Sequence, residues 1–380
     1  MLQRHAGVSK RVLLLLFFYH SLLALVYYVY ALSNPSDSKA YFYKASVKYL
    51  GDNWLDYYGV STAFIDFLSF FVVNRLGLNY EGAMALFAWL GYLGFVFFYV
   101  LLSEKVRYDP KIWGIPATII LLFLPNLHFW SSSLGKGSVI FLGFGLFFFG
   151  LNQPTARWLA LLIGGWIIFQ VRPHIFYVTL IAVGLGYTFS SAGIKLGYRL
   201  VVVVISVFLL NLIYTDVLRL TGLEDDSVLD PFISHRAAEL SKATSGIDIT
   251  NYSIPEKLFA FWFRPLFYDA PGALGIIVSF ENLFYLLFFT QLLRPRAWAY
   301  LLRSEAIIKT ALLTFLGVSV ALAQISGNLG LAMRQKSQVM LLMLFVILKY
   351  RENVLLARKQ LRLRLKALQK TQKQTITQTR

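Results

Sequence analysis

The sequence feature that most constrains this chain is a series of apolar segments that follow one another along most of its length. A helix needs about 20 mostly apolar residues to cross a hydrocarbon layer about 30 Å thick. Of the 380 residues, 57% are hydrophobic and 14% are charged, whereas a soluble domain is about 25% charged. We therefore expect an all-α protein, a polytopic transmembrane helical bundle of about ten spans. The predicted spans are 12–32, 83–102, 113–129, 137–151, 158–171, 175–191, 200–214, 272–293, 306–324 and 337–349.

The short loops between these segments predict the topology. Loops 103–111, 193–199 and 294–303 are rich in Lys and Arg and fall on one side of the membrane. Basic loops normally stay inside, so this is the cytoplasmic side. The start, "MLQRHAGVSKR", and the end, 350–380, are also basic, and we expect both termini to be cytoplasmic. Because the first segment, 12–32, is longer than the roughly 7 to 15 apolar residues of a signal peptide, we expect an uncleaved span.

A further apolar segment, 59–77, contains Asp66 and has Arg75 near its end. Its apolar residues recur at helical spacing. Counted as a span, it would place the two basic termini on opposite sides of the membrane. We therefore predict that this segment is an interfacial or re-entrant helix.

Polar sequence is confined to loops and one tail, which predicts a single transmembrane helical domain over 1–349. Its large outer loops, about 33–82 and 215–271, are expected to carry interfacial helices. Residues 350–380 form a basic cytoplasmic tail, predicted to bind anionic membrane lipids. The net charge of +17 is spread over short loops and this tail, so we expect no nucleic acid partner.

The chain has no cysteine, which excludes disulfides and thiolate metal sites. Neither a metal nor a cofactor is expected.

Charged residues in the most apolar part of the chain are the first candidates for function. Glu281 lies ten residues into the segment 272–293, where a carboxylate costs about 2.5 to 3.5 kcal/mol on insertion scales. Glu281 either forms a hydrogen bond that packs one helix against another or belongs to a functional site. Arg264 and Asp269 lie just before it in "FRPLFYDAPG", at the outer membrane surface; the alternative there is an aromatic belt with a snorkelling arginine.

Two further clusters lie at predicted outer helix ends. In "QVRPHIF", a very short turn holds Arg172 and His174, and a guanidinium can bind a phosphate through two parallel hydrogen bonds. In "NLHFWSSSLGKGS", His128 and Lys136 accompany serines and glycines at the start of a helix, a combination suited to an anion. The alternative is that these residues simply end a span or lie at the interface.

A third cluster, "GNLGLAMRQKS", places Arg334 and Lys336 at the outer mouth of the last span. Cations held outside oppose the usual charge bias and indicate an anion, such as a diphosphate carried on a lipid. Asp37, in "NPSDSKAYFYKA" after the first span, is the candidate general base for an acceptor hydroxyl. A solvated loop carboxylate is the alternative for Asp37.

With these motifs, scattered over roughly residues 30–340, the chain resembles the bacterial O-antigen and exopolysaccharide polymerases and the related C-type glycosyltransferases. The resemblance implies a catalytic carboxylate in the first outer loop, which is Asp37 here. It also implies arginines that handle a lipid diphosphate, which are Arg172, Arg264 and Arg334. The chain departs from the C-type pattern because it has no sizeable soluble domain and no acidic pair directly after the first span.

We therefore expect an enzyme of cell-envelope polysaccharide assembly in a bacterial inner (cytoplasmic) membrane. It would be a glycan polymerase or glycosyltransferase that uses polyprenyl-diphosphate-linked sugars at the outer face. Alternatives are a transporter or flippase of a lipid-linked saccharide or anion, and a noncatalytic scaffold subunit. The catalytic candidates are Asp37, Glu281 and His174, and the substrate-binding candidates are Arg172, Arg264, Arg334, Lys336, Lys136, His128 and Asp269.

Overall fold

The computed structural model describes residues 7–49, 51, 53–190, 195–221, 246, 249, 251–270, 272–324 and 326–378. Almost all regular structure in these residues is helical, so the all-α class expected from the sequence is confirmed. A small hairpin, which the apolar pattern did not predict, is the exception. Its strands β1 (Lys111–Ile112) and β2 (Ile115–Pro116) are joined by Trp113 and Gly114, both with positive φ.

All the predicted apolar segments form helices, except that segment 113–129 begins in the hairpin and its helical part is interrupted once. Segment 113–129 is divided into α5 (Ala117–Leu122) and α6 (Pro125–Trp130). Pro125 has no N–H to donate, and it restricts Leu124 to extended backbone, so one helix cannot run through this point. The other long helices are α1 (Lys10–Ser33), α4 (Tyr80–Lys105), α7 (Lys136–Asn152), α8 (Trp158–Val171), α9 (Pro173–Ser190), α10 (Leu196–Thr221), α13 (Gly272–Phe289), α15 (Ala306–Ala323) and α17 (Met340–Gln378).

Five helices among the described residues are long and apolar enough to cross a membrane. They are Lys10–Ser33, Tyr80–Lys105, Pro173–Ser190, Gly272–Leu293 and Ala306–Ala323. The chain is therefore a membrane protein. The last predicted span, 337–349, takes a central position, because residues 339–348 at the start of α17 are at most 2% exposed.

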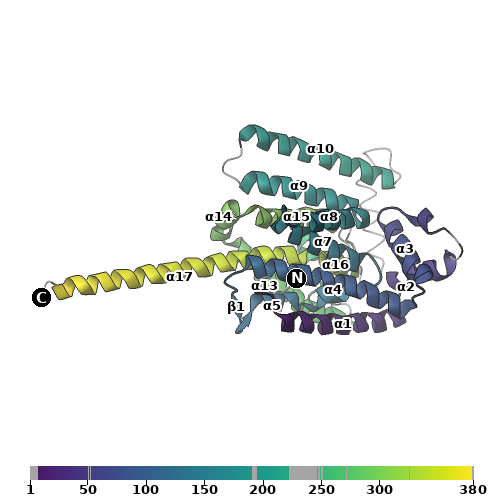
Figure 1. Cartoon of the computed structure of the whole chain (residues 1–380), viewed down its shortest axis with the longest axis horizontal. Helices are drawn as coiled ribbons and strands as arrows, with labels where there is room; N and C mark the ends of the chain where they lie inside the picture. Colours follow the sequence, from purple (N-terminus) through teal and green to yellow (C-terminus); the bar gives the residue numbers. More distant parts are fainter. Residues whose placement is uncertain are drawn as a thin grey trace.

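The long helices run roughly parallel and form a layered bundle (Figure 1). Helix α1 packs on α4, α4 on α7, and α7 on α8, while α9 packs on both α15 and α10. Glycines allow close approach inside this bundle. A Cβ on Gly145 of α7 would lie 2.7 Å from the carbonyl oxygen of Gly94 in α4, and one on Gly164 of α8 would lie 2.4 Å from the backbone nitrogen of Phe147.

At one end of the bundle, the predicted first outer loop folds into short helices, and we call this the α2–α3 end (Figure 1). Segment 59–77, predicted to be interfacial or re-entrant, forms α3 and a single π-helical turn there, and it is not among the helices able to span a membrane. The elements are α2 (Asp37–Tyr43), η2 (Lys44–Lys48), η3 (Trp54–Tyr57), α3 (Thr62–Phe70) and η4 (Phe71–Arg75).

About half of the predicted large outer loop 215–271, mainly 222–245, lies outside the described residues. Its described part includes α12 (Ile254–Phe263), which begins with a capping box of Ser253 and Glu256. Two short helices complete the fold, α14 (Pro295–Arg303) and α16 (Leu329–Lys336).

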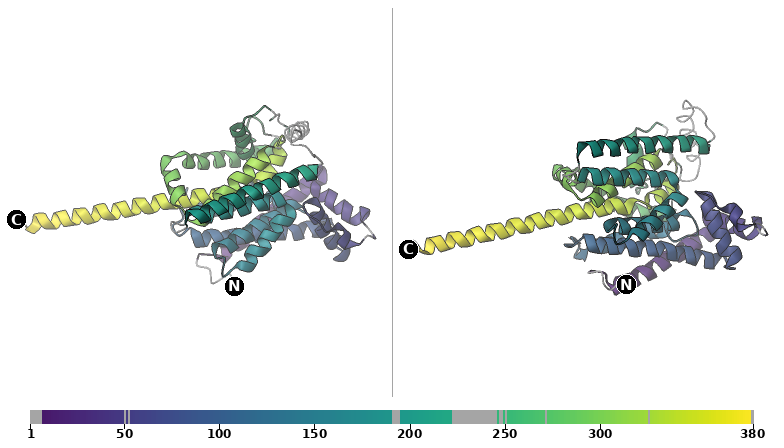
Figure 2. Two further views of the ribbon diagram at one scale, coloured as in Figure 1. Left: turned by 90° about the horizontal axis from the view of Figure 1, so that it is seen from above. Right: turned by 45° about the horizontal axis from the view of Figure 1, so that its top comes forward.

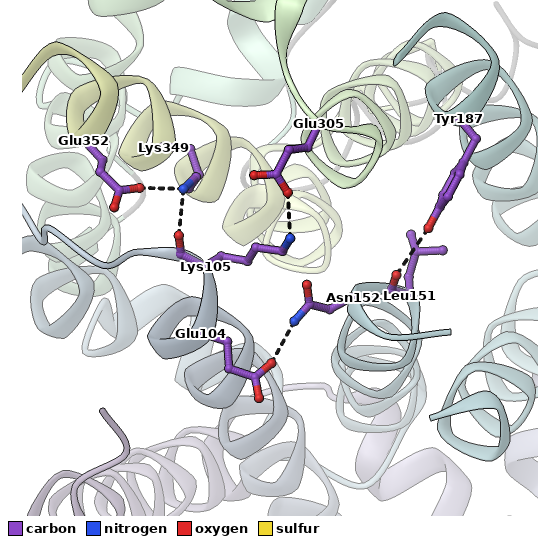
Figure 3. A network of polar contacts seen from close by, with 8 residues as sticks. All are labelled: Glu104, Lys105, Leu151, Asn152, Tyr187, Glu305, Lys349 and Glu352. Carbon is purple, nitrogen blue, oxygen red and sulfur yellow. Dashed lines mark hydrogen bonds and ion pairs between the residues drawn. The ribbon is translucent and has the colours of Figure 1, made fainter. Parts of the chain in front are cut away.

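The opposite end of the bundle, the tail end, is where the described chain begins and where α17 leaves the bundle. Gly7 lies beside Ser103 at the C-terminal end of α4, and Lys349 Nζ donates to the carbonyl oxygen of Lys105 at 2.6 Å. Figure 3 shows the polar network that ties the helices together there, including the pair of Lys105 and Glu305 at 2.6 Å.

Glu352 fixes the direction of α17 at this end. It pairs with Lys349 at 2.5 Å and accepts the backbone N–H groups of Arg107 at 2.7 Å and Tyr108 at 2.9 Å. Beyond it, α17 continues as one straight helix that projects away from the bundle (Figures 1 and 2). The prediction that this tail binds anionic lipids stays a prediction.

Candidate anion site at the α2–α3 end

The structure divides the predicted site residues into three groups. Lys136, Arg172, His174, Arg334 and Asp37 gather at the α2–α3 end. Glu281 and Lys336 belong to a buried network between α6, α12, α13 and α16, and Arg264 and Asp269 close a half-buried turn beside it. His128 lies apart from both, inside the bundle.

The first group is built from helix ends. Arg172 occupies the single-residue break between α8 and α9, where Pro173 starts the new helix. Its Nε is buried, and no described residue accepts a hydrogen bond from it. Burial, and then the charge of Arg334, lower the pKa of Arg172 to about 10. This arginine therefore stays charged at neutral pH, and its buried donor is available to an anion.

Lys136 begins α7 and faces the same region. Its Nζ donates to the hydroxyls of Ser61 at 3.0 Å and Thr62 at 2.9 Å. The charges of Arg172 and Arg334 act on this ammonium, as do those of the carboxylates of Asp37 and Asp66. The charges of Arg172 and Lys136 also act on His174. Three cations from α7, the α8–α9 break and α16 thus lie within electrostatic range of one another.

Ser61 supports this group from α3. It has a φ of 63° and a ψ of −117°, a conformation rare for residues other than glycine. Its N–H donates to the carbonyl oxygen of Gln170 at 2.6 Å, which joins the start of α3 to the end of α8. Sequence reasoning missed Ser61 and Thr62, because nothing in "GVSTAF" indicates a contact with Lys136.

Asp37 and Arg334 form an ion pair between α2 and α16. Asp37 is the more open partner, with 53% of its side chain exposed against 22% for Arg334. A pocket of about 350 Å³ opens beside the pair and is lined by aromatic residues that include Tyr27, Tyr30 and Trp130. Tyr41 of α2 is also close, and burial, followed by the charge of Asp37, raises its pKa to about 12.

A larger apolar pocket of about 770 Å³ adjoins this polar one. It lies between α1, α6, α13 and α16, and it includes Leu23, Phe129 and Ile277. Tyr30, Pro35, Trp130 and Gly330 line both pockets. The polar pocket therefore opens directly onto an apolar groove flanked by two membrane-spanning helices, an arrangement that fits an amphiphile.

Arg264 and Asp269 do not join the cations around Arg172 but close a turn of their own. Arg264 Nε donates to Asp269 at 2.5 Å, and Arg264 also contacts the Tyr252 hydroxyl at 3.3 Å. Asp269 accepts the backbone N–H of Leu266 at 2.6 Å. The geometry therefore does not favour the expected diphosphate contact of Arg264, because this arginine lies apart from the cations around Arg172 and its contacts stay within its own turn.

Lys336 and Glu281 form the core of a buried polar network. Lys336 is 0% exposed, and its Nζ donates to the carbonyl oxygens of Trp262 at 3.1 Å and Arg264 at 3.0 Å and to Asn282 Oδ1 at 2.6 Å. These three acceptors match the three donors of an ammonium. The side chain thus caps the C-terminal end of α12 and does not point toward the cations at the α2–α3 end.

Glu281 plays the matching part at an N-terminus. It accepts the backbone N–H of Asn126, in the first turn of α6, at 2.7 Å and also accepts a hydrogen bond from the Tyr285 hydroxyl. Negative charge is favourable at a helix N-terminus. Of the two readings left open by the sequence, the contacts favour helix packing for Glu281.

His128 forms a buried pair with His20 of α1. Their Nδ1 atoms lie 2.9 Å apart, and the His128 ring stacks on Phe95 at 3.8 Å between centroids. His128 Nε2 also lies 2.7 Å from the carbonyl oxygen of Leu122, at the end of α5. This location does not support the predicted role of His128 in anion binding. The one sequence feature that could have indicated the histidine pair is His20, a polar residue inside an apolar segment.

Comparisons with protein-family models, curated proteins and solved structures find no match to this chain. The resemblance to polysaccharide polymerases therefore depends on the short motifs alone. Among the described residues, no group of three or more His, Asp or Glu side chains could hold a metal ion.

Proposed function

We propose that this membrane protein is a glycosyltransferase or polymerase of cell-envelope polysaccharide assembly, acting on polyprenyl-diphosphate-linked sugars at the α2–α3 end. The observation that carries the proposal is the joining of a cationic cluster to an apolar groove. Lys136, Arg172 and Arg334 provide the cations, and the groove between α1 and α13 begins at the Asp37–Arg334 pair. A diphosphate with a long hydrocarbon chain is complementary to both parts.

The proposed chemistry uses these residues in two roles. The bond between the sugar's anomeric carbon and the diphosphate breaks, and the leaving group gains negative charge that fixed cations stabilise. The acceptor hydroxyl forms the new bond to the anomeric carbon, and its proton passes to the Asp37 carboxylate. Glu281 is not retained as a base, because it caps α6 inside the bundle.

The side of the membrane follows from charge. The α2–α3 end lies opposite the tail end, where the basic loops 103–111 and 294–303 lie, the described chain begins and α17 leaves the bundle. The positive-inside tendency makes the tail end cytoplasmic. The proposed reaction would then take place at the outer face of a bacterial inner membrane.

The test is an assay of bond formation by the full chain in lipid bilayers. A polyprenyl-diphosphate-linked oligosaccharide is supplied, and product length is followed on a gel. Lys136→Ala, Arg172→Ala and Arg334→Ala should each lower the rate by about 10²- to 10³-fold, the usual effect of removing one transition-state donor. Lys48→Ala, an exposed lysine at the same end, is the matched control. Wild-type product from all three variants would end the proposal.

A flippase is the second candidate, because ionisable side chains buried among spanning helices often mark transport pathways. His20, His128, Glu281 and Lys336 are all at most 4% exposed. A fluorescent lipid-linked saccharide that crosses the bilayer with no new glycosidic bond would favour this second candidate.

A further inference from the structure

Helix α14 differs in direction from the long helices of the bundle. It connects two membrane-spanning helices at the tail end, following α13 and η6 and preceding α15. In the view from above in Figure 2, this short light-green helix at the left of the bundle runs across the direction of the long helices. A helix placed this way between two spans lies in the plane of the membrane surface.

The three faces of α14 differ in burial and polarity. Ala297 and Leu301 are buried against the bundle, and the Tyr300 ring contacts that of Tyr350 in α17 at 5.8 Å between centroids. About a third of a turn away, Trp298 and Leu302 are 57% and 76% exposed.

Arg296 and Arg303 take up the remaining face and are exposed. With 3.6 residues per turn, Trp298 and Leu302 share one side while Arg296 and Arg303 share another. Apolar residues on one side and arginines on the other are the pattern of a helix at a lipid–water boundary, with the arginines at headgroup level.

A second arginine pair lies beside this helix. Arg294 stands just before α14, and its charge, after burial, lowers the pKa of Arg351 in α17. The Arg351 guanidinium lies over the Phe288 ring at the end of α13, 5.4 Å from its centroid. Like charges repel each other, and an anion bound by both arginines removes that repulsion.

We propose that α14, with Arg294 and Arg351, is a binding site for an anionic phospholipid of the tail-end leaflet. The lipid phosphate lies between the two guanidinium groups, and its acyl chains lie against Leu293, Trp298 and Leu302. Arginine suits this role because its planar group binds phosphate oxygens in pairs. The site is independent of the proposed enzyme activity, which belongs to the opposite end of the bundle.

The depth of α14 can be measured directly, because the chain contains no cysteine. Leu302→Cys and Arg303→Cys are labelled with a nitroxide in lipid bilayers. The label at 302 should be accessible to oxygen dissolved in the hydrocarbon, whereas the label at 303 should be accessible to a water-soluble nickel complex. Equal access of the nickel complex to both positions would refute the interfacial placement.

Lipid selectivity is tested on the full chain with phosphatidylglycerol and phosphatidylcholine as probes. The double variant Arg294→Gln/Arg351→Gln should bind phosphatidylglycerol about 30-fold more weakly, from about 1 kcal/mol for each arginine near the surface. The control Lys48→Gln/Arg75→Gln removes the same charge from exposed positions at the opposite end of the bundle and should leave binding unchanged. Equal retention of the two lipids by the unmodified chain, or equal loss in both variants, would overturn the proposal.

Discussion

Replacing Lys336 by methionine distinguishes two roles for this side chain, binding substrate and capping a helix. The sequence places this lysine among the substrate-binding cations, whereas the structure buries it as a cap on α12. In Lys336→Met the carbonyl oxygens of Trp262 and Arg264 and the amide oxygen of Asn282 lose their donor. The buried carboxylate of Glu281 also loses the nearby positive charge that acts on it.

The size of the effect follows from the number of groups left without partners. A buried polar atom left without a hydrogen bond costs about 1 to 3 kcal/mol, and a hydrogen bond to a charged group is worth about 1.5 to 3 kcal/mol. These costs overlap, since the same ammonium serves all the contacts, so we expect a loss of about 3 to 5 kcal/mol. In a chain of this size, that loss lowers the midpoint of thermal unfolding by about 4 to 6 °C.

The assay is the loss of the monodisperse peak in size-exclusion chromatography after heating in detergent. Lys48→Met, which changes an exposed lysine in the same way, is the matched control and should melt with the unmodified chain. Adding Glu281→Gln to Lys336→Met should recover part of the loss, because it removes the uncompensated charge. If Lys336→Met kept the original midpoint but lost activity, the capping role would be wrong and the substrate-binding prediction would be right.

Three further variants test other parts of the structure. Gly145→Ala should destabilise the protein by about 1 to 3 kcal/mol, since its Cβ would meet the carbonyl oxygen of Gly94 at 2.7 Å, whereas Gly197→Ala in open space should raise the thermal midpoint slightly. Glu352→Gln weakens the anchor of α17 and should expose residues after 352 to limited proteolysis at lower protease concentrations; an unchanged cleavage pattern would contradict this. Asp37→Asn should abolish product formation while the substrate is still retained, and activity within a few-fold of normal would exclude Asp37 as the base.

Local sequence signals predicted where the helices form, but they predicted less well where each helix begins and ends. A long apolar run must be helical in a membrane, since every backbone group needs an internal partner. That reasoning holds for α1 and α4 without any tertiary information. Pro125 shows its limit, because the apolar segment 113–129 read as a single helix although the proline divides it into α5 and α6.

The sequence alone determined that this chain is helical, belongs in a membrane and concentrates cations at particular helix ends, because these properties depend on residues close together in the chain. Only the tertiary structure decided which of those cations meet. Arg172 and Arg334 are far apart in sequence but act on each other, whereas Arg334 and Lys336, two residues apart in α16, face different surroundings. Residues two positions apart on a helix point about 200° away from each other, so neighbours in sequence are separated while distant segments supply the contacts.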